Sequence, residues 1–164
     1  MSTSIGEHRY ALTATWTGDL GSGTSGYRDY SRDVTLQVHG KPDLLGSADR
    51  PFRGDPARWN PEDMLLGALS QCHLLSYLHA CVEAGVRVRS YRDEATGVMR
   101  LQGPAGSFVE VVLRPIVVVE HEDMVAAAVD AHEQAHRWCF IANSVSFPVR
   151  VEPQVSVVRA EGPA

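Results

Sequence analysis

The stretch NPEDMLLGALSQCHLLSYLHACVEAG, residues 60–85, decides the fold because it carries the signals of one long helix. Asn60 is a favoured N-cap residue, and Pro61 suits the first helical position. Glu62 places negative charge near the positive end of the helix dipole. Gly85 is the residue type that commonly ends a helix. We therefore predict a helix that begins near residue 61 and ends shortly before Gly85.

Apolar residues fall on every face of this predicted helix. A helix that is apolar all round must be covered all round. At about 1.5 Å per residue, 24 residues of helix extend over roughly 36 Å. One small chain can hardly bury that length, so we expect a homodimer in which a second copy of the chain covers part of the helix.

Strand patterns flank the helix on both sides. Residues 9–16 and 33–40 alternate between apolar and polar, and the Pro- and Gly-rich residues 40–60 predict a long loop. After the helix, strands are predicted over residues 86–93, 96–101 and 107–120, a helix over 122–138, a turn or short helix over 139–148, and a strand over 149–160. Pro115 indicates an edge or bulged strand. With the interrupted run over residues 107–120 left out of the count, the order β-β-α-β-β-α-β is an α+β pattern.

Composition limits the classes of function. The 164 residues suit one domain over residues 1–164, and the net charge of −5 without a Lys/Arg cluster argues against a nucleic-acid partner. The N-terminal residues have no apolar signal region, so we expect a cytoplasmic protein. Residues 64–82 carry Gln71, His73 and His79, which favours a buried core helix over a membrane span.

Three cysteines cannot form a closed set of disulfides, so their chemistry has to be considered singly. Cys72, His73, His79 and Cys81 are residue types that bind zinc. Each residue of a helix turns by about 100°, so Cys81 lies about 180° from Cys72 around the axis. One ion cannot collect both, and we expect no metal site. On composition alone Cys72 fits a buried thiol as well as a redox-active one.

Two segments together indicate a family. NPEDMLLGALSQC, residues 60–72, is followed by AHRWCFIANSVSFPV, residues 135–149. Their glutamate, first cysteine and second cysteine are Glu62, Cys72 and Cys139. This arrangement resembles the OsmC/organic hydroperoxide resistance family, and the order of strands and helices agrees along nearly the whole chain. The resemblance implies an OsmC-like fold, with antiparallel sheets around a long buried central helix, in an intertwined dimer.

The resemblance also implies a thiol peroxidase that needs no cofactor. Cys72 would attack an organic hydroperoxide, release an alcohol and become a sulfenic acid. Cys139 would resolve that acid as a disulfide, which an external thiol or dithiol would reduce. Glu62 would hold an arginine against the Cys72 sulfur, stabilising its thiolate and polarising the peroxide.

The arginine has several candidates. Arg53 is favoured, because its segment leads directly into the helix that carries Glu62. The others are Arg28, Arg32, Arg50 and Arg58. Ten residues of helix rise about 15 Å, so Glu62 cannot meet the Cys72 of its own helix directly. Unless a long arginine bridges that gap, Glu62 serves the Cys72 of the partner chain, and we predict the second arrangement.

The remaining motif residues are expected to have structural roles. His73 should be a core or interface histidine, Cys81 a buried thiol, and Asn143 and Ser144 partners of turn backbone. The aromatic side chains near the motifs could line an apolar pocket; they are Trp16, Trp59, Trp138, Phe52, Phe140 and Phe147. An alternative function is therefore a weakly active or non-catalytic dimer that binds a small apolar ligand. Disulfide exchange on proteins is disfavoured, because the chain has no C-x-x-C pair.

Overall fold

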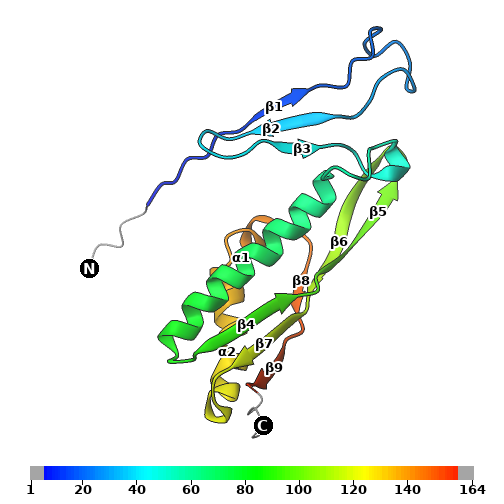
Figure 1. The fold of residues 1–164 in the computed structure, drawn as a ribbon. Coiled ribbons are helices and arrows are strands. Elements are labelled where there is room, and N and C mark those ends of the chain that lie inside the picture. Colours follow the sequence, from blue (N-terminus) through cyan, green and yellow to red (C-terminus); the bar gives the residue numbers. More distant parts are fainter. Residues whose placement is uncertain (1–5, 159–164) are drawn as a thin grey trace, which may run out of the picture. The chain divides into compact units, whose positions relative to one another are not determined.

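The computed structural model describes residues 6–158 and confirms a mixed α+β fold (Figure 1). The chain divides into two compact units, residues 1–64 and 65–164. The first unit contains three strands and a short 3-10 helix; these are β1 (Thr13–Trp16), β2 (Val34–Gln37), β3 (Leu44–Gly46) and η1 (Arg50–Phe52).

The helix α1 (Pro61–Glu83) crosses from the first unit into the second. The second unit continues with β4 (Val88–Asp93), β5 (Thr96–Gln102), β6 (Ala105–Leu113), β7 (Pro115–Val119), η2 (Glu122–Met124), α2 (Val125–Trp138), η3 (Ala142–Ser144), β8 (Val149–Val151) and β9 (Gln154–Val157). The second helix and the short helix after it therefore lie where the sequence predicted them.

The first unit is a three-stranded antiparallel sheet in the order β1-β2-β3. The prediction of one continuous loop over residues 40–60 was wrong, because that range includes β3 and η1. Leu44 pairs with Leu36 of β2, and Gly46 also bridges to Trp59. A strand of only three residues is too short to show an alternating pattern, and its existence depends on pairing with residues distant in sequence.

Both ends of α1 follow the local signals. The Asn60 side chain accepts a hydrogen bond from the Asp63 backbone N–H at 2.7 Å and donates one to the Asp63 carboxylate at 2.9 Å. At the other end Gly85 adopts a left-handed φ of 69°, and the Val86 N–H donates to the Cys81 carbonyl at 2.8 Å. This is the capping arrangement that a C-terminal glycine permits.

Replacing Gly85 or Gly67 by alanine should change the free energy of unfolding in opposite directions. Gly85→Ala places a Cβ on left-handed backbone and should lower the free energy of unfolding by about 1 kcal/mol. Gly67→Ala lies in the helix, where the described residues leave open space around a Cβ, and should raise it by roughly 0.5–1 kcal/mol. Urea denaturation of both variants at one protein concentration measures the effects. Equal shifts of the two midpoints would contradict this account.

The second unit contains two three-stranded sheets, in the orders β4-β7-β9 and β5-β6-β8. The pairs β4–β7 and β5–β6 are antiparallel, as the fold prediction had them. The pairs β6–β8 and β7–β9 are parallel, which that prediction did not include. The chain returns through α2 before it reaches β8, and such a crossover allows parallel pairing.

Two prolines divide segments that were each predicted as one strand. Pro115 is the first residue of β7, which is the central strand of its sheet, so the prediction of an edge strand was wrong. The run is bulged, but in β6, where the pairing with β5 shifts register at Val109. Proline is tolerated at the first position because the ladder begins there. The last predicted strand is likewise two strands, β8 and β9, separated by Glu152 and Pro153.

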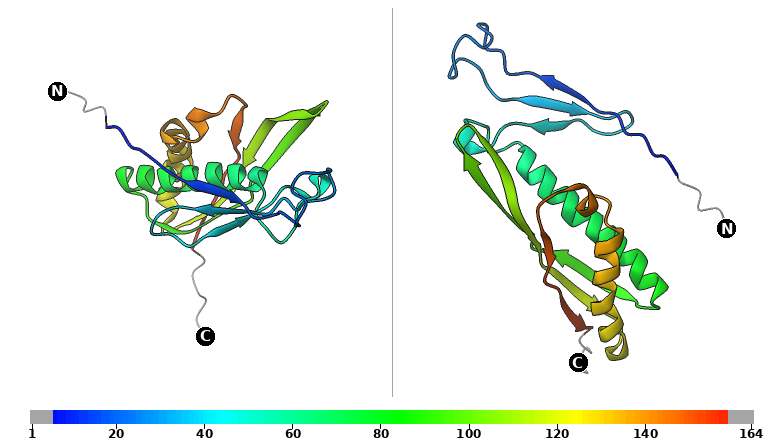
Figure 2. Two further views of the ribbon diagram at one scale, coloured as in Figure 1. Left: turned by 90° about the horizontal axis from the view of Figure 1, so that it is seen from above. Right: turned by 180° about the vertical axis from the view of Figure 1, so that it is seen from behind.

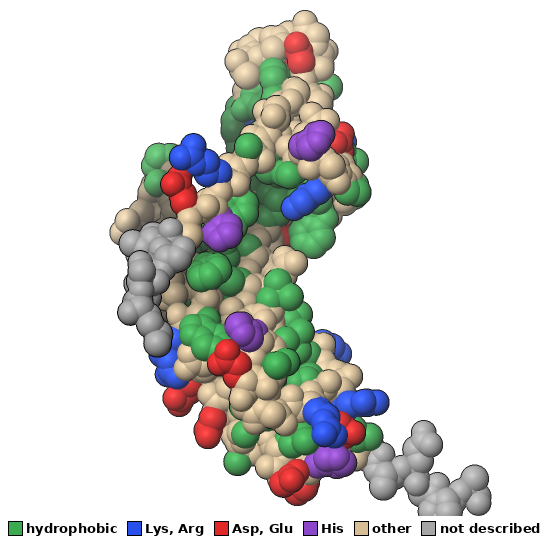
Figure 3. Space-filling view, turned by 90° about the vertical axis from the view of Figure 1, so that its left-hand side faces the viewer, with side chains coloured by type: hydrophobic (Ala, Val, Ile, Leu, Met, Phe, Trp, Pro, Cys, Tyr) green, Lys and Arg blue, Asp and Glu red, His purple; other side chains and the backbone are tan. Residues whose placement is uncertain are grey.

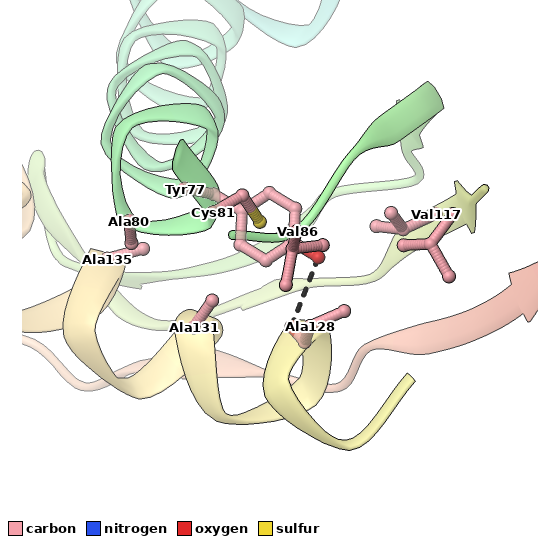
Figure 4. Packing of buried hydrophobic residues seen from close by; sticks show 9 residues of the cluster. Tyr77, Ala80, Cys81, Val86, Val117, Ala128, Ala131 and Ala135 are labelled. Carbon is pink, nitrogen blue, oxygen red and sulfur yellow. Dashed lines mark hydrogen bonds between the residues drawn. The ribbon is translucent and has the colours of Figure 1, made fainter. Parts of the chain in front are cut away.

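One core cluster joins α1, α2 and β7, and the two helices run side by side in it (Figure 2). Figure 4 shows Tyr77 and Ala80 of α1 facing the small side chains of α2, with Cys81 beside the Tyr77 ring. The alanines there are Ala128, Ala131 and Ala135. The Tyr77 hydroxyl donates a hydrogen bond to the Ala128 carbonyl at 3.1 Å. A second cluster contains Leu69, Val111 and Leu113.

Only one stripe of α1 is buried within the described chain. It includes Leu69, His73, Tyr77 and Cys81, at intervals of one helical turn. By length and composition α1 could also cross a membrane, but its buried stripe packs in the protein core. Large apolar side chains such as Leu75 remain exposed, and hydrophobic side chains form patches on the face drawn in Figure 3. Covering of α1 by a second copy stays a prediction.

Candidate functional site

Cys72 and Cys139 come together in the second unit. Cys72 lies on α1 and is half-buried, whereas Cys139 ends α2 and is 1% exposed. Both cysteines are free, and Cys72 lies near enough to Cys139 to help raise the pKa of its thiol. Two residues that are distant in sequence, and that were chosen as candidates from the motif, are therefore neighbours in the fold.

The surroundings of Cys139 favour its neutral thiol. Burial, with a smaller contribution from the neighbouring Cys72, raises the pKa of Cys139 to about 11. The Ala142 N–H donates to the Cys139 sulfur at 3.4 Å, which acts in the opposite direction. Because the nucleophilic form of cysteine is the thiolate, Cys139 is a poor first nucleophile at neutral pH.

Cys72 forms part of the wall of a groove with a volume of about 530 Å³. The other residues that line it are Leu75, Ser76, His79, Arg137, Trp138 and Phe140. Leu75 is 58% exposed and Phe140 is 79% exposed, so much of this wall is apolar surface open to a ligand. A small organic molecule in the groove can reach the Cys72 sulfur while its apolar part stays against these side chains.

The turn after Cys139 confirms the structural roles predicted for Asn143 and Ser144. The Asn143 side chain donates to the Arg137 carbonyl at 3.0 Å, and the Ser144 hydroxyl donates to the Phe140 carbonyl at 2.7 Å. The Asn143 N–H also donates to the Cys139 carbonyl at 3.0 Å. These bonds fix the backbone on both sides of Cys139 and so hold its thiol in place.

Glu62 and Arg53 belong to the first unit. Glu62 lies in the first turn of α1, is half-buried, and its Oε2 atom is buried without a partner among the described residues. Arg53 is exposed and adopts a left-handed φ of 66° as the residue that ends η1. Because α1 is continuous from Pro61, about 15 Å of helical rise separates Glu62 from Cys72. Their action on Cys72 stays a prediction.

The other candidate arginines differ in how many partners their guanidinium groups already have. The Arg32 guanidinium lies over the rings of Tyr27 and Tyr30, 4.4 Å and 4.1 Å from their centroids, and donates to the carbonyls of both residues. Arg58 pairs with Asp33 at 3.5 Å and Asp55 at 3.6 Å, and its Nη1 is buried without a partner among residues 6–158. Arg28 and Arg50 are exposed.

A buried pair of histidines was not predicted. His73 is 0% exposed, which confirms it as a core histidine, and its Nε2 lies 3.0 Å from Nδ1 of His132, which is 3% exposed. The Tyr77 ring stacks on His132, with centroids 3.9 Å apart. Burial lowers the pKa of His73 to about 4 and that of His132 to about 3, so both are neutral at pH 7.

The remaining polar residues of α1 have separate surroundings. Cys81 is a buried thiol in the core cluster, as predicted. His79 is exposed at the groove and lies 3.3 Å from Glu83. Within residues 6–158, no three His, Cys, Asp or Glu side chains gather closely enough to hold a metal ion.

Comparison with protein families matches residues 54–154 to the family described as OsmC-like protein. The chain belongs to the OsmC-like family. The matched range includes Glu62, Cys72 and Cys139, and it confirms the resemblance drawn from the two motif segments.

Known relatives of this OsmC-like chain cover nearly its whole length. An OsmC-like protein of unknown function from Vibrio cholerae is 30% identical, with a TM-score of 0.80 over 90% of this chain and 100% of that one. An organic hydroperoxide resistance protein from Elizabethkingia anophelis is 16% identical, with a TM-score of 0.66 over 93% of this chain and 99% of that one. The uncharacterized protein YmaD of Bacillus subtilis is 24% identical over 93% of this chain and 97% of its own length.

Proposed function

We propose that this OsmC-like protein is a cysteine-based peroxidase that reduces organic hydroperoxides to alcohols. The observation that carries the proposal is the position of Cys72, which is half-buried, lines a largely apolar groove and is a neighbour of the Cys139 thiol. A thiol beside a second thiol can be oxidised and then restored, because a sulfenic acid condenses with a neighbouring thiol. The organic hydroperoxide resistance protein of Elizabethkingia anophelis shares the fold, which agrees with the proposal.

Three steps complete one turnover. The Cys72 sulfur attacks an oxygen of ROOH, the O–O bond breaks, and ROH leaves with the thiol proton, so Cys72 becomes a sulfenic acid. The Cys139 thiol then attacks that sulfur, which forms a disulfide and releases water. An external thiol or dithiol supplies two electrons and two protons and returns both thiols.

The neutral state of Cys139 suits the second role. A thiol that stays protonated at neutral pH does not compete for the peroxide, and its place next to Cys72 would allow attack once the sulfenic acid exists. The apolar walls of the groove favour an organic peroxide over hydrogen peroxide, because they would pack against its organic group. Of the aromatic side chains considered from sequence, Trp138 and Phe140 line this groove, whereas Phe147 packs against Phe108.

We further propose a homodimer in which Glu62 and an arginine stabilise the Cys72 thiolate of the partner chain. The Glu62 Oε2, buried without a partner among the described residues, supports this, since a buried polar atom that lacks a hydrogen-bond partner is costly. Arg53 is the candidate favoured by sequence. Arg58 is a second candidate, because its guanidinium is anchored by Asp33 and Asp55 while Nη1 is left unpaired among residues 6–158.

Stoichiometric cumene hydroperoxide tests the peroxidase activity of the reduced protein. We expect rapid loss of two of the three thiols, with a Cys72–Cys139 disulfide found by peptide mapping and Cys81 unchanged. Cys139→Ser should complete one turnover and then over-oxidise, because no resolving thiol remains. Cys81→Ala is the matched control and should keep the reaction. Arg53→Gln and Arg58→Gln in the same assay identify the arginine.

Survival of the thiols for minutes in excess peroxide would rule out the enzyme. The groove would then be interpreted as a binding site for a small apolar ligand in a dimer without catalysis. Loss of thiols without the Cys72–Cys139 disulfide would support the attack of Cys72 on the peroxide and exclude Cys139 as the resolving thiol.

A further inference from the structure

We infer that Arg137 makes the groove beside Cys72 selective for hydroperoxides that carry a carboxylate. This inference rests on the proposed peroxidase function and adds a substrate class to it. Arg137 lines the same groove as Cys72, on the wall that also includes Trp138 and Phe140. It is the one lining residue with a permanent charge, and no lining residue carries a carboxylate.

The charge of Arg137 is left available. Its Nη2 donates a hydrogen bond to the neutral Gln134 side chain at 2.5 Å, and no carboxylate of the described residues forms an ion pair with it. Four other arginines of this unit are paired, among them Arg87 with Glu120 at 3.3 Å and Arg150 with Glu110 at 2.7 Å, whereas Arg89 and Arg100 form no ion pair within residues 6–158. Arg137 therefore contributes a positive charge without an ion pair to an otherwise largely apolar groove, and Asp130 and Glu133 lie with it at a neighbouring hollow, not in this groove.

The guanidinium group fits one kind of ligand especially well. Its planar N–H groups match a carboxylate, and hydrogen bonds between charged groups are about twice as strong as those between neutral ones. The whole chain has a net charge of −5, which disfavours anions in general. A local cation next to the reactive sulfur is thus the feature that would admit an anionic substrate.

The groove combines the three features that such a substrate needs. The Cys72 sulfur faces the peroxide, the exposed Leu75 and Phe140 side chains contact an apolar body, and Arg137 binds the carboxylate. A volume of about 530 Å³ leaves room for an aromatic or branched organic group. The ligand class is an amphipathic organic hydroperoxide with one carboxylate.

Two matched substrates test the inference: cumene hydroperoxide with a para-carboxylate, and the same compound with a neutral para-carboxamide. We expect the intact protein to have the higher kcat/KM for the carboxylate. Arg137→Gln should lower the carboxylate-to-carboxamide ratio of kcat/KM about tenfold, and Arg137→Lys should lower it less. Arg150→Gln, which removes another arginine of the same unit, is the matched control and should keep the ratio.

The inference is overturned if the intact protein treats the two substrates alike, or if Arg137→Gln leaves their ratio unchanged. The inference is also overturned if Arg137→Gln loses activity on both substrates equally and changes its oligomeric state. That result would mean that the surface around Arg137 contacts a second copy of the chain. If cumene hydroperoxide itself is not reduced, the proposed function fails separately. Calorimetric binding of 4-isopropylbenzoate and 4-isopropylbenzamide then decides the charge preference without turnover.

Discussion

Mixing two inactive variants should restore peroxidase activity. Cys72→Ser removes the nucleophile, and Glu62→Gln removes the charge that we assign to the partner's site. In a mixed dimer, the Cys72 of the Glu62→Gln chain meets the Glu62 of the Cys72→Ser chain, so one complete site forms. Because half of the dimers are mixed and one of the two sites in each is complete, we expect about a quarter of the activity of the original protein after subunit exchange. Steady-state reduction of cumene hydroperoxide measures it.

Subunit exchange needs its own control. Glu83→Gln removes an exposed carboxylate of the same helix, and this variant alone should stay active. Mixing Cys72→Ser with Cys139→Ser tests whether those two cysteines work within one chain, as we expect from their closeness in the second unit. A mixed sample of Cys72→Ser and Glu62→Gln that stays inactive, although mass spectrometry finds mixed dimers, would place Glu62 at the site of its own chain.

Acid should destabilise the protein through His73 and His132. Burial holds their pKa values at about 4 and about 3, whereas an exposed histidine titrates near 6.5. Below pH 6.5 the two histidines of the unfolded chain bind protons, whereas those of the folded protein do not. Their effect on the free energy of unfolding is therefore absent above that pH and lowers this free energy as the pH falls toward 4. At about 1.36 kcal/mol per pH unit for each histidine, the loss between pH 6.5 and 4.5 is roughly 3–5 kcal/mol.

Urea denaturation over this pH range measures the loss. The double variant His73→Leu, His132→Leu removes both titrating rings together, so neither imidazole is left buried without its partner. Its free energy of unfolding should therefore change less with pH than that of the original protein. His121→Gln removes an exposed histidine and should keep the slope of the original protein. Identical slopes for the double variant and the original protein would assign the acid sensitivity to carboxylates.

Local signals in the sequence predicted the elements that depend on local physics. The cap at Asn60 and the left-handed residue at Gly85 act on backbone within a few residues, so the bounds of α1 could be predicted. The short strand β3 and the parallel partners of β6 and β7 could not, because pairing between distant segments leaves no periodic pattern. Pro115 was misjudged for the same reason: its segment reads as an interrupted strand, whereas the chain uses the proline to begin a central one.

The candidate site could be predicted in part. The spacing of Glu62, Cys72 and Cys139 indicated the two cysteines, and the fold brings these together. A single sequence gives no sign that His73 meets His132, which lies 59 residues further along the chain. Arg137 stood inside the quoted motif, but its significance depends on which carboxylates lie nearby, and only the folded chain shows that.

The two parallel pairings have a consequence for the order in which the protein can be made. β8 and β9 are the last strands of the described chain, and each completes one of the two sheets of the second unit. Until the ribosome releases them, the edges of β6 and β7 that they later occupy offer unpaired N–H and C=O groups to other chains. Premature termination near residue 148 would therefore yield a product that keeps both helices and the cysteines but is prone to aggregate through open strand edges.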